Sequence, residues 1–399
     1  MQTEDLIKAL AKEYFSEIQS FRRYIHQHPE LSKQEKNTAA FIAAELKKIG
    51  IPFQENIGGY GIVGLISGAK EGKTIGLRAD MDALPIHEKN THEYISKNPG
   101  VMHACGHDAH IACLVGAAKI LHTLKDSFSG NIKLIFQPSE ENFPGGAIQM
   151  IKEGVLENPK VDFMLGQHVF PQLQSGEIGI KAGKLMASTD EVYINVLGKG
   201  GHGATPHLNT DAVVIASQII LALQQLISRN NAPDNPSILS FGRFIADGKT
   251  NIIPDTVQLE GTLRCFNEDW RATAHKRIVE IAEKTAAAMQ AKAEVRIEKG
   301  YPFLINNVTL SHNLSAHFQA VFGKEKIKEI DLQMTAEDFA YFSHQVPSCF
   351  IKLGCANKEK NITANLHNAC FDIDENSLYY GTVVLATAAL HLLSEYEQN

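Results

Sequence analysis

The segment Met102–His110 contains one thiol and three imidazoles, and it directly precedes an apolar stretch, Ile111–Leu124, that is expected to be helical. Cysteine and histidine bind zinc and other borderline divalent metals through sulfur and nitrogen. Cys105 and His107 are separated by a single glycine, so both could reach one small ion from an extended loop. We therefore interpret this segment as a candidate metal-binding loop.

Two adjacent carboxylates, Glu140 and Glu141, follow the apolar stretch Asn131–Gln137. Paired acidic residues commonly lie on solvated surfaces, but a position just after a buried strand favours a binding site. One of the two carboxylates can bind a metal ion while the other takes a proton from an activated water. These residues predict a metal-dependent hydrolase.

The first 180 or so residues alternate short apolar strands with helices, which predicts a largely parallel α/β sheet. Such sheets bind ligands at the carboxyl ends of their strands. Metal-type residues follow three of the predicted strands, at Asp80 and Asp82, at Glu140 and Glu141, and at His168. The strands in question are Thr74–Arg78, Asn131–Gln137 and Val161–Leu165.

The pattern changes from about Lys184, where strands and two long helices follow in the order β-α-β-β-α-β of a ferredoxin-like unit. The predicted elements are Glu191–Leu197, Asp211–Arg229, Ser237–Ile245, Val257–Cys265, Glu268–Gln290 and Ala293–Glu298. The sequence thus predicts a discontinuous catalytic α/β domain, residues 1–183 and 300–399, and an inserted domain, residues 184–299.

Composition predicts an ordinary globular protein, with 44% hydrophobic and 21% charged residues. The net charge of −7 is spread along the chain, which argues against a nucleic-acid partner. We expect no membrane span, and the pattern from Leu6 to Ile25 indicates an amphipathic helix rather than a signal peptide. Six cysteines without paired spacing favour reduced thiols and a cytoplasmic location.

Several interpretations of these residues stay open at the level of sequence. With 17 histidines in the chain, any single imidazole is weak evidence, and His103 and His110 cannot be ranked against His107. Cys105 could be a buried structural thiol, a ligand of a structural zinc, or the nucleophile of a cysteine hydrolase. The glycine-rich segment Gly198–His207 lacks the spacing of a phosphate-binding loop, but its His202 could swing over a bound substrate.

Five segments occur in an order that resembles the M20 metallopeptidases, specifically the branch of aminoacylases, hippurate hydrolases and auxin-conjugate hydrolases. They are Asp80–Pro85, His103–Asp108, Gln137–Glu141, Gly198–His202 and Leu366–Asn368. The resemblance extends from Arg22 to the C-terminal helix. It implies a two-metal site in the larger domain and a ferredoxin-like lid domain, often used for dimerisation.

The resemblance also implies a role for individual residues. The metal ligands would be Cys105, His107, Glu141, His168 and His367. Cys105 would bridge the two ions, Glu140 would be the general base for a metal-bridged water, and Asp82 would orient the site. His202 would polarise the scissile carbonyl, from its own chain or from a partner subunit. Asn251 and Arg264 resemble family positions near the substrate carboxylate.

The predicted function is hydrolysis of the amide bond of N-acyl-L-amino acids, with two divalent ions per chain. Zinc or manganese is expected, and cobalt or nickel would suit the same ligands. The predicted partners are a small N-acyl amino acid and a second copy of the chain, bound through the lid. The alternatives are an N-acetyl-diaminopimelate deacetylase or a dipeptidase on the same scaffold, and a metal-dependent protein that binds acyl-amino acids without turnover.

Overall fold

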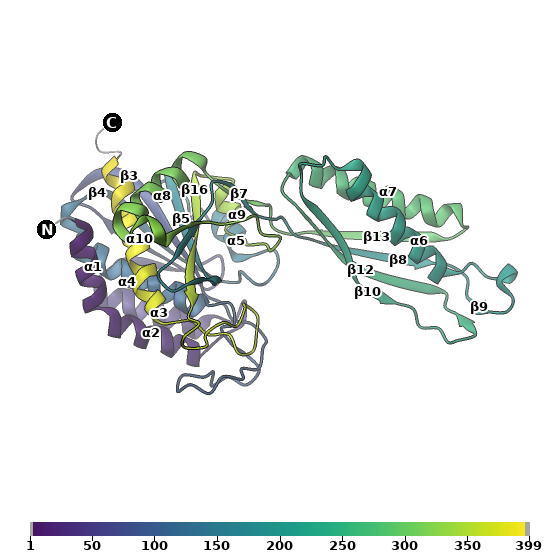
Figure 1. Cartoon of the computed structure of the whole chain (residues 1–399), viewed down its shortest axis with the longest axis horizontal. Helices are drawn as coiled ribbons and strands as arrows, with labels where there is room; N and C mark the ends of the chain where they lie inside the picture. Colours follow the sequence, from purple (N-terminus) through teal and green to yellow (C-terminus); the bar gives the residue numbers. More distant parts are fainter. Residues whose placement is uncertain (1–2, 396–399) are drawn as a thin grey trace. The chain divides into compact units, whose positions relative to one another are not determined.

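The computed structural model describes residues 3–395, and over this range the chain forms two compact units (Figure 1). The first unit comprises the described residues up to Gly183, Ile305–Asp331, and the chain from Asp338 onward. The second unit comprises Lys184–Leu304 and Leu332–Glu337. A lid role for the second unit stays a prediction.

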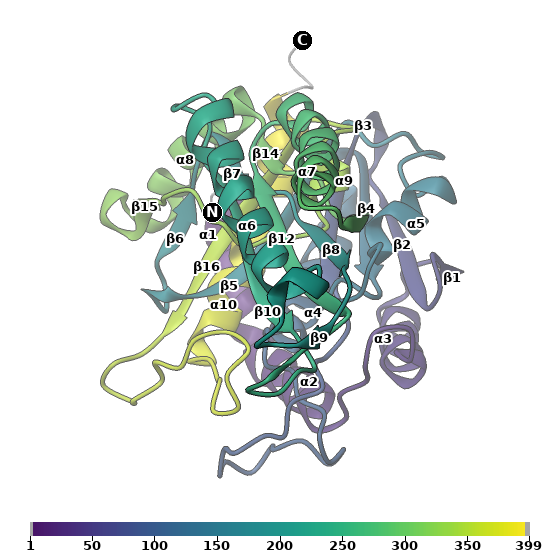
Figure 2. The same cartoon turned by 90° about the vertical axis from the view of Figure 1, so that its right-hand side faces the viewer.

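The first unit is built on a sheet in the order β1-β2-β4-β3-β5-β16-β6-β15, with β15 and β1 at its two edges (Figure 2). Its central strands β4, β3, β5 and β16 are parallel. This confirms the predicted α/β class with a mostly parallel sheet. The strands are β1 Phe53–Ile57, β2 Gly61–Ser67, β3 Lys70–Asp80, β4 Ser129–Gln137, β5 Phe163–Gln174, β6 Ile178–Ile180, β15 Ile327–Glu329 and β16 Ser348–Ala356.

Helices cover both faces of this sheet. Cys349, Ile351 and Leu353 of β16 belong to the apolar core that also contains α4 and α10, whereas Phe350 packs against Phe339 beside α9. This burial on both faces explains the unbroken apolar runs of the parallel strands. The helices are α1 Thr3–Glu13, α2 Phe15–Gln27, α3 Lys36–Ile49, α4 His107–Thr123, α5 Gly146–Lys152, α8 Val308–Phe322, α9 Ala340–Ser343 and α10 Asn376–Glu395.

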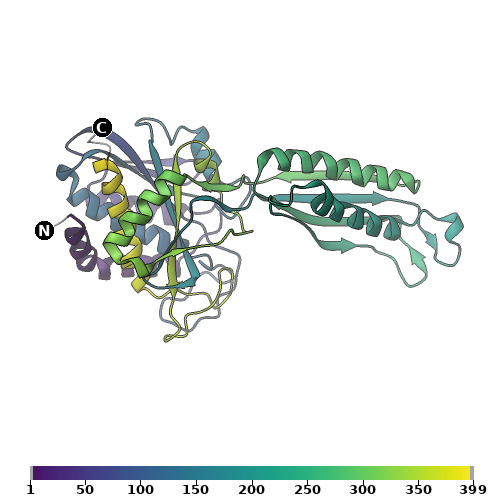
Figure 3. The same ribbon diagram turned by 45° about the horizontal axis from the view of Figure 1, so that its top comes forward.

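The second unit has a four-stranded antiparallel sheet in the order β10-β12-β8-β13, with helices α6 and α7 packed on it (Figure 3). The chain order β8-α6-β10-β12-α7-β13 is ferredoxin-like, as the sequence predicts. The main elements are β8 Asp190–Leu197, α6 Ala212–Gln225, β10 Ser237–Ile245, β12 Thr256–Cys265, α7 Glu268–Ala288 and β13 Lys292–Lys299. Shorter strands are β7 Gly183–Met186, β9 Gly201–His202, β11 Ile252–Ile253 and β14 Leu304–Asn306.

Three predicted boundaries are wrong. The N-terminal amphipathic stretch is two helices, α1 and α2, which meet at Tyr14. Helix α4 begins at His107, so His107 and His110 lie on its first turn and not in an extended loop. Strand β5 continues to Gln174 because its second half pairs with β16, and His168 therefore lies within the strand and not after it.

Two helical segments, Ala212–Asn230 and Asn376–Glu395, have the length and apolar composition of a membrane span. The second is largely buried within the first unit, and the first has one face in the core of the second unit. Helices in the core of a soluble protein pass the same test of length and composition. All six cysteines are free thiols, as the sequence predicts.

Candidate metal centre

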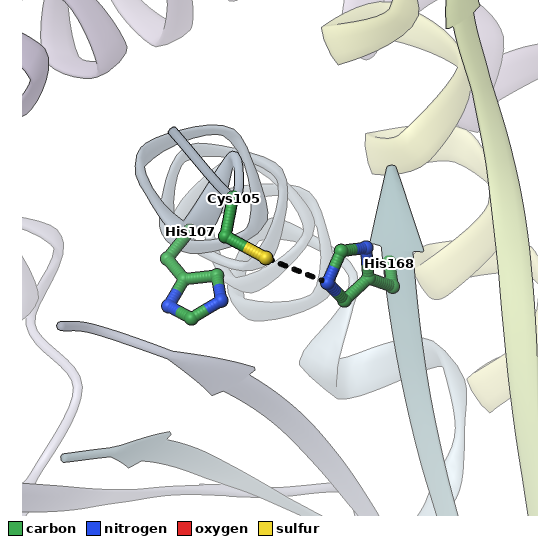
Figure 4. A group of neighbouring side chains, drawn as sticks. All are labelled: Cys105, His107 and His168. Carbon is green, nitrogen blue, oxygen red and sulfur yellow. Dashed lines mark hydrogen bonds between the residues drawn. The ribbon is translucent and has the colours of Figure 1, made fainter. Parts of the chain in front are cut away.

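Five of the predicted site residues come together in the first unit. Cys105, His107 and His168 each offer a ligand atom, and these atoms lie within 4.8 Å of one another (Figure 4). Cys105, Glu141 and His367 form a second group that meets the same criterion. Since Cys105 belongs to both groups, the arrangement can hold two ions that share one sulfur.

The hydrogen bonding of these side chains fits bound cations. Within residues 3–395, neither ring nitrogen of His107 makes a hydrogen bond, and Oε1 of Glu141 makes none although Nε2 of His367 lies 3.2 Å away. Ligand atoms about 2.0–2.1 Å from one tetrahedral ion lie about 3.3 Å apart. Buried polar atoms without a partner are costly in a folded protein, and a metal ion would satisfy them.

His168 presents a lone pair to Cys105. Its Nδ1 lies 2.7 Å from the carbonyl oxygen of Val169, so this nitrogen carries the proton and donates it. The Nε2 atom is then the acceptor, and it lies 3.4 Å from Sγ of Cys105 (Figure 4). Burial lowers the pKa of His168 well below its usual value, which keeps the ring neutral. A neutral imidazole fixed through its second nitrogen is the usual form of a histidine ligand.

The surroundings of Cys105 oppose a free nucleophilic thiolate. Burial raises the pKa of its thiol well above the usual value, and the nearby carboxylates of Glu141 and Glu140 raise it further. Reactive cysteines have lowered pKa values in electropositive surroundings. A bound cation reverses this effect, because a coordinating thiol loses its proton. The geometry therefore favours the ligand role of Cys105 over the cysteine-hydrolase alternative.

Asp82 holds the two glutamates in place from behind. Its carboxylate accepts hydrogen bonds from the backbone N–H groups of Glu140 (3.1 Å) and Glu141 (2.9 Å) and from the hydroxyl of Ser32 (2.6 Å). Its Oδ1 also lies 3.3 Å from Nδ1 of His107. One buried carboxylate thus contacts both the strand-end loop and the first turn of α4.

His107 lies between two carboxylates. Burial alone would lower the pKa of His107, but Asp80 and Asp82 outweigh that effect and raise the pKa to about 10. An imidazole that pairs one nitrogen with a carboxylate keeps the other for a metal ion and becomes more basic. The structure therefore places His107 where a cation is electrostatically favoured.

The structure separates His110 and His103 from the ligand groups that share Cys105. His110 donates Nδ1–H to Asp80 (2.6 Å) and accepts the backbone N–H of Val169 at Nε2 (2.9 Å), so both its nitrogens are used. His103 is buried, with no hydrogen-bond partner for either nitrogen among the described residues. The sequence left the role of His110 open, because its partners, Asp80 in β3 and Val169 in β5, lie far from it in the chain.

The two remaining residues, His367 and Glu140, lie at the edge of the site. His367 has a positive φ of 61°, and its backbone N–H donates to the carbonyl oxygen of Ala104 at 2.8 Å, which fixes its loop beside Cys105. Glu140 is buried, and its Oε1 lies 3.4 Å from the backbone N–H of Asp338. Asp338 also forms an ion pair with Arg78, with Nη2 of Arg78 2.9 Å from Oδ1 of Asp338. The sequence alone did not single out Asp338.

The remaining predicted residues belong to the second unit and lie at opposite ends of it. His202 in β9 pairs with Ile252 of β11, directly after Asn251, and both His202 and Asn251 are exposed. Arg264 lies near the far end of β12, where its Nε donates to the hydroxyl of Thr262 at 3.1 Å. Arg264 is eight positions further along the strand than Thr256, a length of about 27 Å. One copy of this unit therefore does not bring Arg264 close to His202.

Comparisons with known proteins identify the family of this chain. Residues 76–391 match the model of the peptidase family M20/M25/M40. The chain is 39% identical to the N-acetyl-L-cysteine deacetylase of Bacillus subtilis (strain 168), over 95% of this chain and 88% of that protein. It is 42% identical to the N-acyl-L-amino acid amidohydrolase of Geobacillus stearothermophilus, over 76% of this chain and 82% of that protein.

Among solved structures, a dinuclear metal-binding peptidase of the M20 family from Bacillus subtilis superposes with a TM-score of 0.83 at 32% identity. The alignment covers 96% of this chain and 99% of that one. The chain belongs to the peptidase family M20/M25/M40, which confirms the predicted family. Family membership and the paired ligand groups together support two divalent metal ions per chain.

Proposed function

We propose that this M20-family metal-dependent amidohydrolase cleaves the amide bond of N-acyl-L-amino acids into a carboxylate and a free amino acid. The observation that carries the proposal is the pair of ligand groups that share Cys105, with Glu140 next to them on a buried loop. The names of the two relatives, an N-acetyl-L-cysteine deacetylase and an N-acyl-L-amino acid amidohydrolase, supply the substrate class.

The proposed metal ligands are Cys105, His107, Glu141, His168 and His367. Bound divalent ions would polarise the acyl carbonyl and lower the pKa of the attacking water. Zinc or manganese fits this mixture of sulfur, nitrogen and oxygen donors, and cobalt or nickel would suit the same geometry.

Glu140 is proposed to move the proton. Its backbone is held by Asp82 and its carboxylate lies beside the backbone N–H of Asp338, so the side chain has a defined position at the ligand groups. Glu140 takes a proton from the attacking water and returns it to the leaving nitrogen, because an amine must be protonated to leave. Asp82 acts as a positioning residue through the loop and through His107.

In the second unit, His202 is proposed to stabilise the developing oxyanion, with Asn251 and Arg264 near the substrate carboxylate. His202 and Arg264 lie at opposite ends of one copy of this unit, which favours contributions from two copies to one site. A homodimer formed through the second unit would provide this arrangement. Six free cysteines, five of them buried, fit a reducing compartment, and we propose the cytoplasm.

The test is release of free amine from N-acetyl, N-benzoyl and N-indoleacetyl amino acids by chelator-stripped protein, before and after addition of Zn²⁺ or Mn²⁺. We expect release that depends on added metal and that Glu140→Ala abolishes. Glu157→Ala, which removes an exposed carboxylate outside the ligand groups, is the matched control and should retain activity.

The other outcomes separate the alternatives. Release from dipeptides or from N-acetyl-diaminopimelate, with none from the acyl-amino acids, would replace the proposed substrate class. Tight metal uptake without release from any of these compounds would identify a binding protein. Activity that survives complete metal removal would contradict the proposed mechanism.

A further inference from the structure

A second group of histidines and carboxylates lies in the first unit and shares no member with the proposed metal ligands. Oε1 of Glu88 lies 3.2 Å from Nε2 of His26, in α2, and 3.3 Å from Nε2 of His92. Nε2 of His92 also lies 3.8 Å from Oδ2 of Asp372, in the loop that precedes α10. Three separate parts of the chain thus meet at this point.

His26 donates its Nδ1 proton to Asp108 and not to Glu88. Nδ1 of His26 lies 2.8 Å from Oδ2 of Asp108, which can only accept, so Nδ1 carries a proton and donates it. In the neutral ring, Nε2 then presents a lone pair to the carboxylate of Glu88. Two lone pairs at 3.2 Å need a cation between them, either a second proton on the ring or a metal ion.

His92 faces the same oxygen of Glu88. Within the described part of the chain neither of its ring nitrogens makes a hydrogen bond, although Nε2 is 3.3 Å from Glu88. The contact is close enough for a charged pair but lacks the alignment of a hydrogen bond. Nε2 of His26 and Nε2 of His92 therefore both face one carboxylate oxygen, with a hydrogen bond from His26 and none from His92.

The ligand atoms of His26, Glu88 and His92 lie within 4.8 Å of one another, close enough to share one metal ion. Two nitrogen or oxygen ligands about 2.0–2.1 Å from one tetrahedral ion lie about 3.3 Å from each other. The contacts of Glu88 with His26 and His92 measure 3.2 and 3.3 Å, and that of His92 with Asp372 measures 3.8 Å. Two imidazoles and two carboxylates are a donor set of the zinc class.

Neighbouring groups hold these side chains in position. The Tyr94 ring stacks on His92 with centroids 3.8 Å apart, and its hydroxyl donates to Oδ2 of Asp372 at 2.9 Å. The second oxygen of Glu88 accepts the backbone N–H of Ser96 at 2.7 Å. Such outer contacts orient ligands in metal sites, and the bond from His26 to Asp108 is the histidine–carboxylate contact typical of them.

The positive charge of Arg22 is directed at the outer carboxylates. Its Nε pairs with Asp108 at 2.6 Å and its Nη2 with Oδ1 of Asp372 at 2.8 Å. Among the described residues Glu88 has no pair with Arg22, and its Oε1 faces the two imidazoles and accepts a hydrogen bond from Nδ2 of Asn90 at 3.0 Å. The side chains of His92 and Asp372 are 19% and 16% exposed, which gives an ion a route from solvent.

We propose that His26, Glu88, His92 and Asp372 form a further binding site for a zinc-class divalent cation, separate from the centre that contains Cys105. This ion would connect α2 to the loop that leads into Met102–His110 and to the loop before α10. The site goes beyond the proposed hydrolysis and is tested without an activity assay.

The experiment counts and locates bound zinc. Chelator-stripped full-length protein is equilibrated with Zn²⁺, freed of excess metal, and analysed by inductively coupled plasma mass spectrometry. His92→Phe removes one ligand and keeps an aromatic ring against Tyr94. His87→Phe makes the same change at an exposed histidine of the same loop and is the matched control.

We expect about three zinc ions per chain in the unaltered protein and in His87→Phe, and about two in His92→Phe. Crystals of the zinc-loaded protein should show an anomalous peak at the zinc edge about 2.1 Å from Nε2 of His26 and of His92. Circular dichroism of the metal-free proteins verifies that His92→Phe is folded.

Saturation at two ions, both in the centre that contains Cys105, would overturn the proposal. So would an unchanged zinc content in His92→Phe, or an anomalous peak at other surface histidines. These results leave the proposed hydrolysis untouched, because each of them concerns only whether the cluster of His26, Glu88 and His92 holds an ion, and none of them measures release of amine.

Discussion

The candidate site residues of the two units differ in how firmly the fold holds them. In the first unit, Cys105, His107 and His168 are buried, and His107 and His168 lie on a helix and a strand of the core. In the second unit, His202 and Asn251 are exposed on a two-stranded ribbon. His202 makes short-range contacts there, such as that of its Nδ1 with the backbone N–H of Ala204 at 3.0 Å.

This difference corresponds to two kinds of catalytic contribution. Ligands and general bases act best when they are preorganised in a dry setting, because no reorganisation is then needed during reaction. An exposed histidine reaches that condition only when another surface covers it. We infer that the first unit carries a complete metal centre, whereas His202 becomes part of a site only after substrate or a second copy covers it.

The largest expected effect is that of Glu140→Gln. Loss of the general base should lower kcat about 10²–10⁴-fold, with metal content unchanged, because the amide keeps the shape but cannot take the proton. Steady-state kinetics on the best acyl-amino acid, with metal analysis of the same sample, checks this. Glu157→Gln is the control, and a Glu140→Gln protein with near-normal kcat would remove Glu140 from the mechanism.

Substitution of His202 tests the second unit directly. His202→Ala should lower kcat about 10²–10³-fold, the range for loss of one oxyanion donor, and change the KM much less. His207→Ala, at an exposed histidine of the same loop, should retain activity. Equal losses in the two variants would show that the loop and not the imidazole matters.

Mixing the two inactive proteins sharpens this comparison. If His202 acts on the metal centre of a second copy, mixed dimers of Glu140→Gln and His202→Ala contain one intact site. Activity should then reappear after the variants are mixed under conditions that exchange subunits. A mixture that remains inactive although exchange is demonstrated would place His202 at the metal centre of its own chain.

A smaller effect is expected from Asp82→Asn in the first unit. The amide cannot serve the two backbone N–H groups and His107 as the carboxylate does, so metal affinity should fall about 10–100-fold. Competition with a chelator of known affinity measures this change, and kcat at saturating metal should change less. Unchanged affinity would mean that the loop of Glu140 and Glu141 holds its shape without Asp82.

The sequence predicts much of the proposed metal centre because several of its residues lie in short local patterns. Cys105 and His107 are neighbours in the chain, and so are Glu140 and Glu141. The structure brings these together with His168 and His367, although their roles remain proposals. Strand order and register decide whether such motifs come together in the fold. In this chain the motifs lie on or beside neighbouring strands of the sheet.

The histidines that the sequence could not rank are distinguished only by contacts between distant segments of the chain. Both ring nitrogens of His110 make hydrogen bonds, to Asp80 and to the backbone of Val169, and both partners come from strands distant in the sequence. The cluster of His26, Glu88 and His92 is likewise invisible in sequence, since it forms where α2 meets an irregular loop. The role of a single histidine can be assigned only when its contacts in the folded protein are known.

A buried ring nitrogen without a hydrogen-bond partner is not necessarily a metal ligand. His317 in α8 provides an example. Its Nε2 has no hydrogen-bond partner among the described residues, and its ring stacks on His391 with centroids 4.1 Å apart. Burial, with a smaller contribution from His391, lowers the pKa of His317 from 6.5 to about 4. The folded protein therefore resists protonation of this ring, whereas the unfolded chain accepts the proton near pH 6.5.

The contribution of His317 to stability is therefore complete above pH 6.5 and is lost as the pH falls towards 4. Because the ring is partly exposed, the loss between pH 7 and 5 should be about 1–2 kcal/mol. Urea unfolding should show that His317→Phe loses less stability over this range than the unaltered protein. His312→Phe, at an exposed position of the same helix, should not differ from the unaltered protein. An identical pH dependence in all three would show that His317 is already hydrated, and its missing partner would then be water.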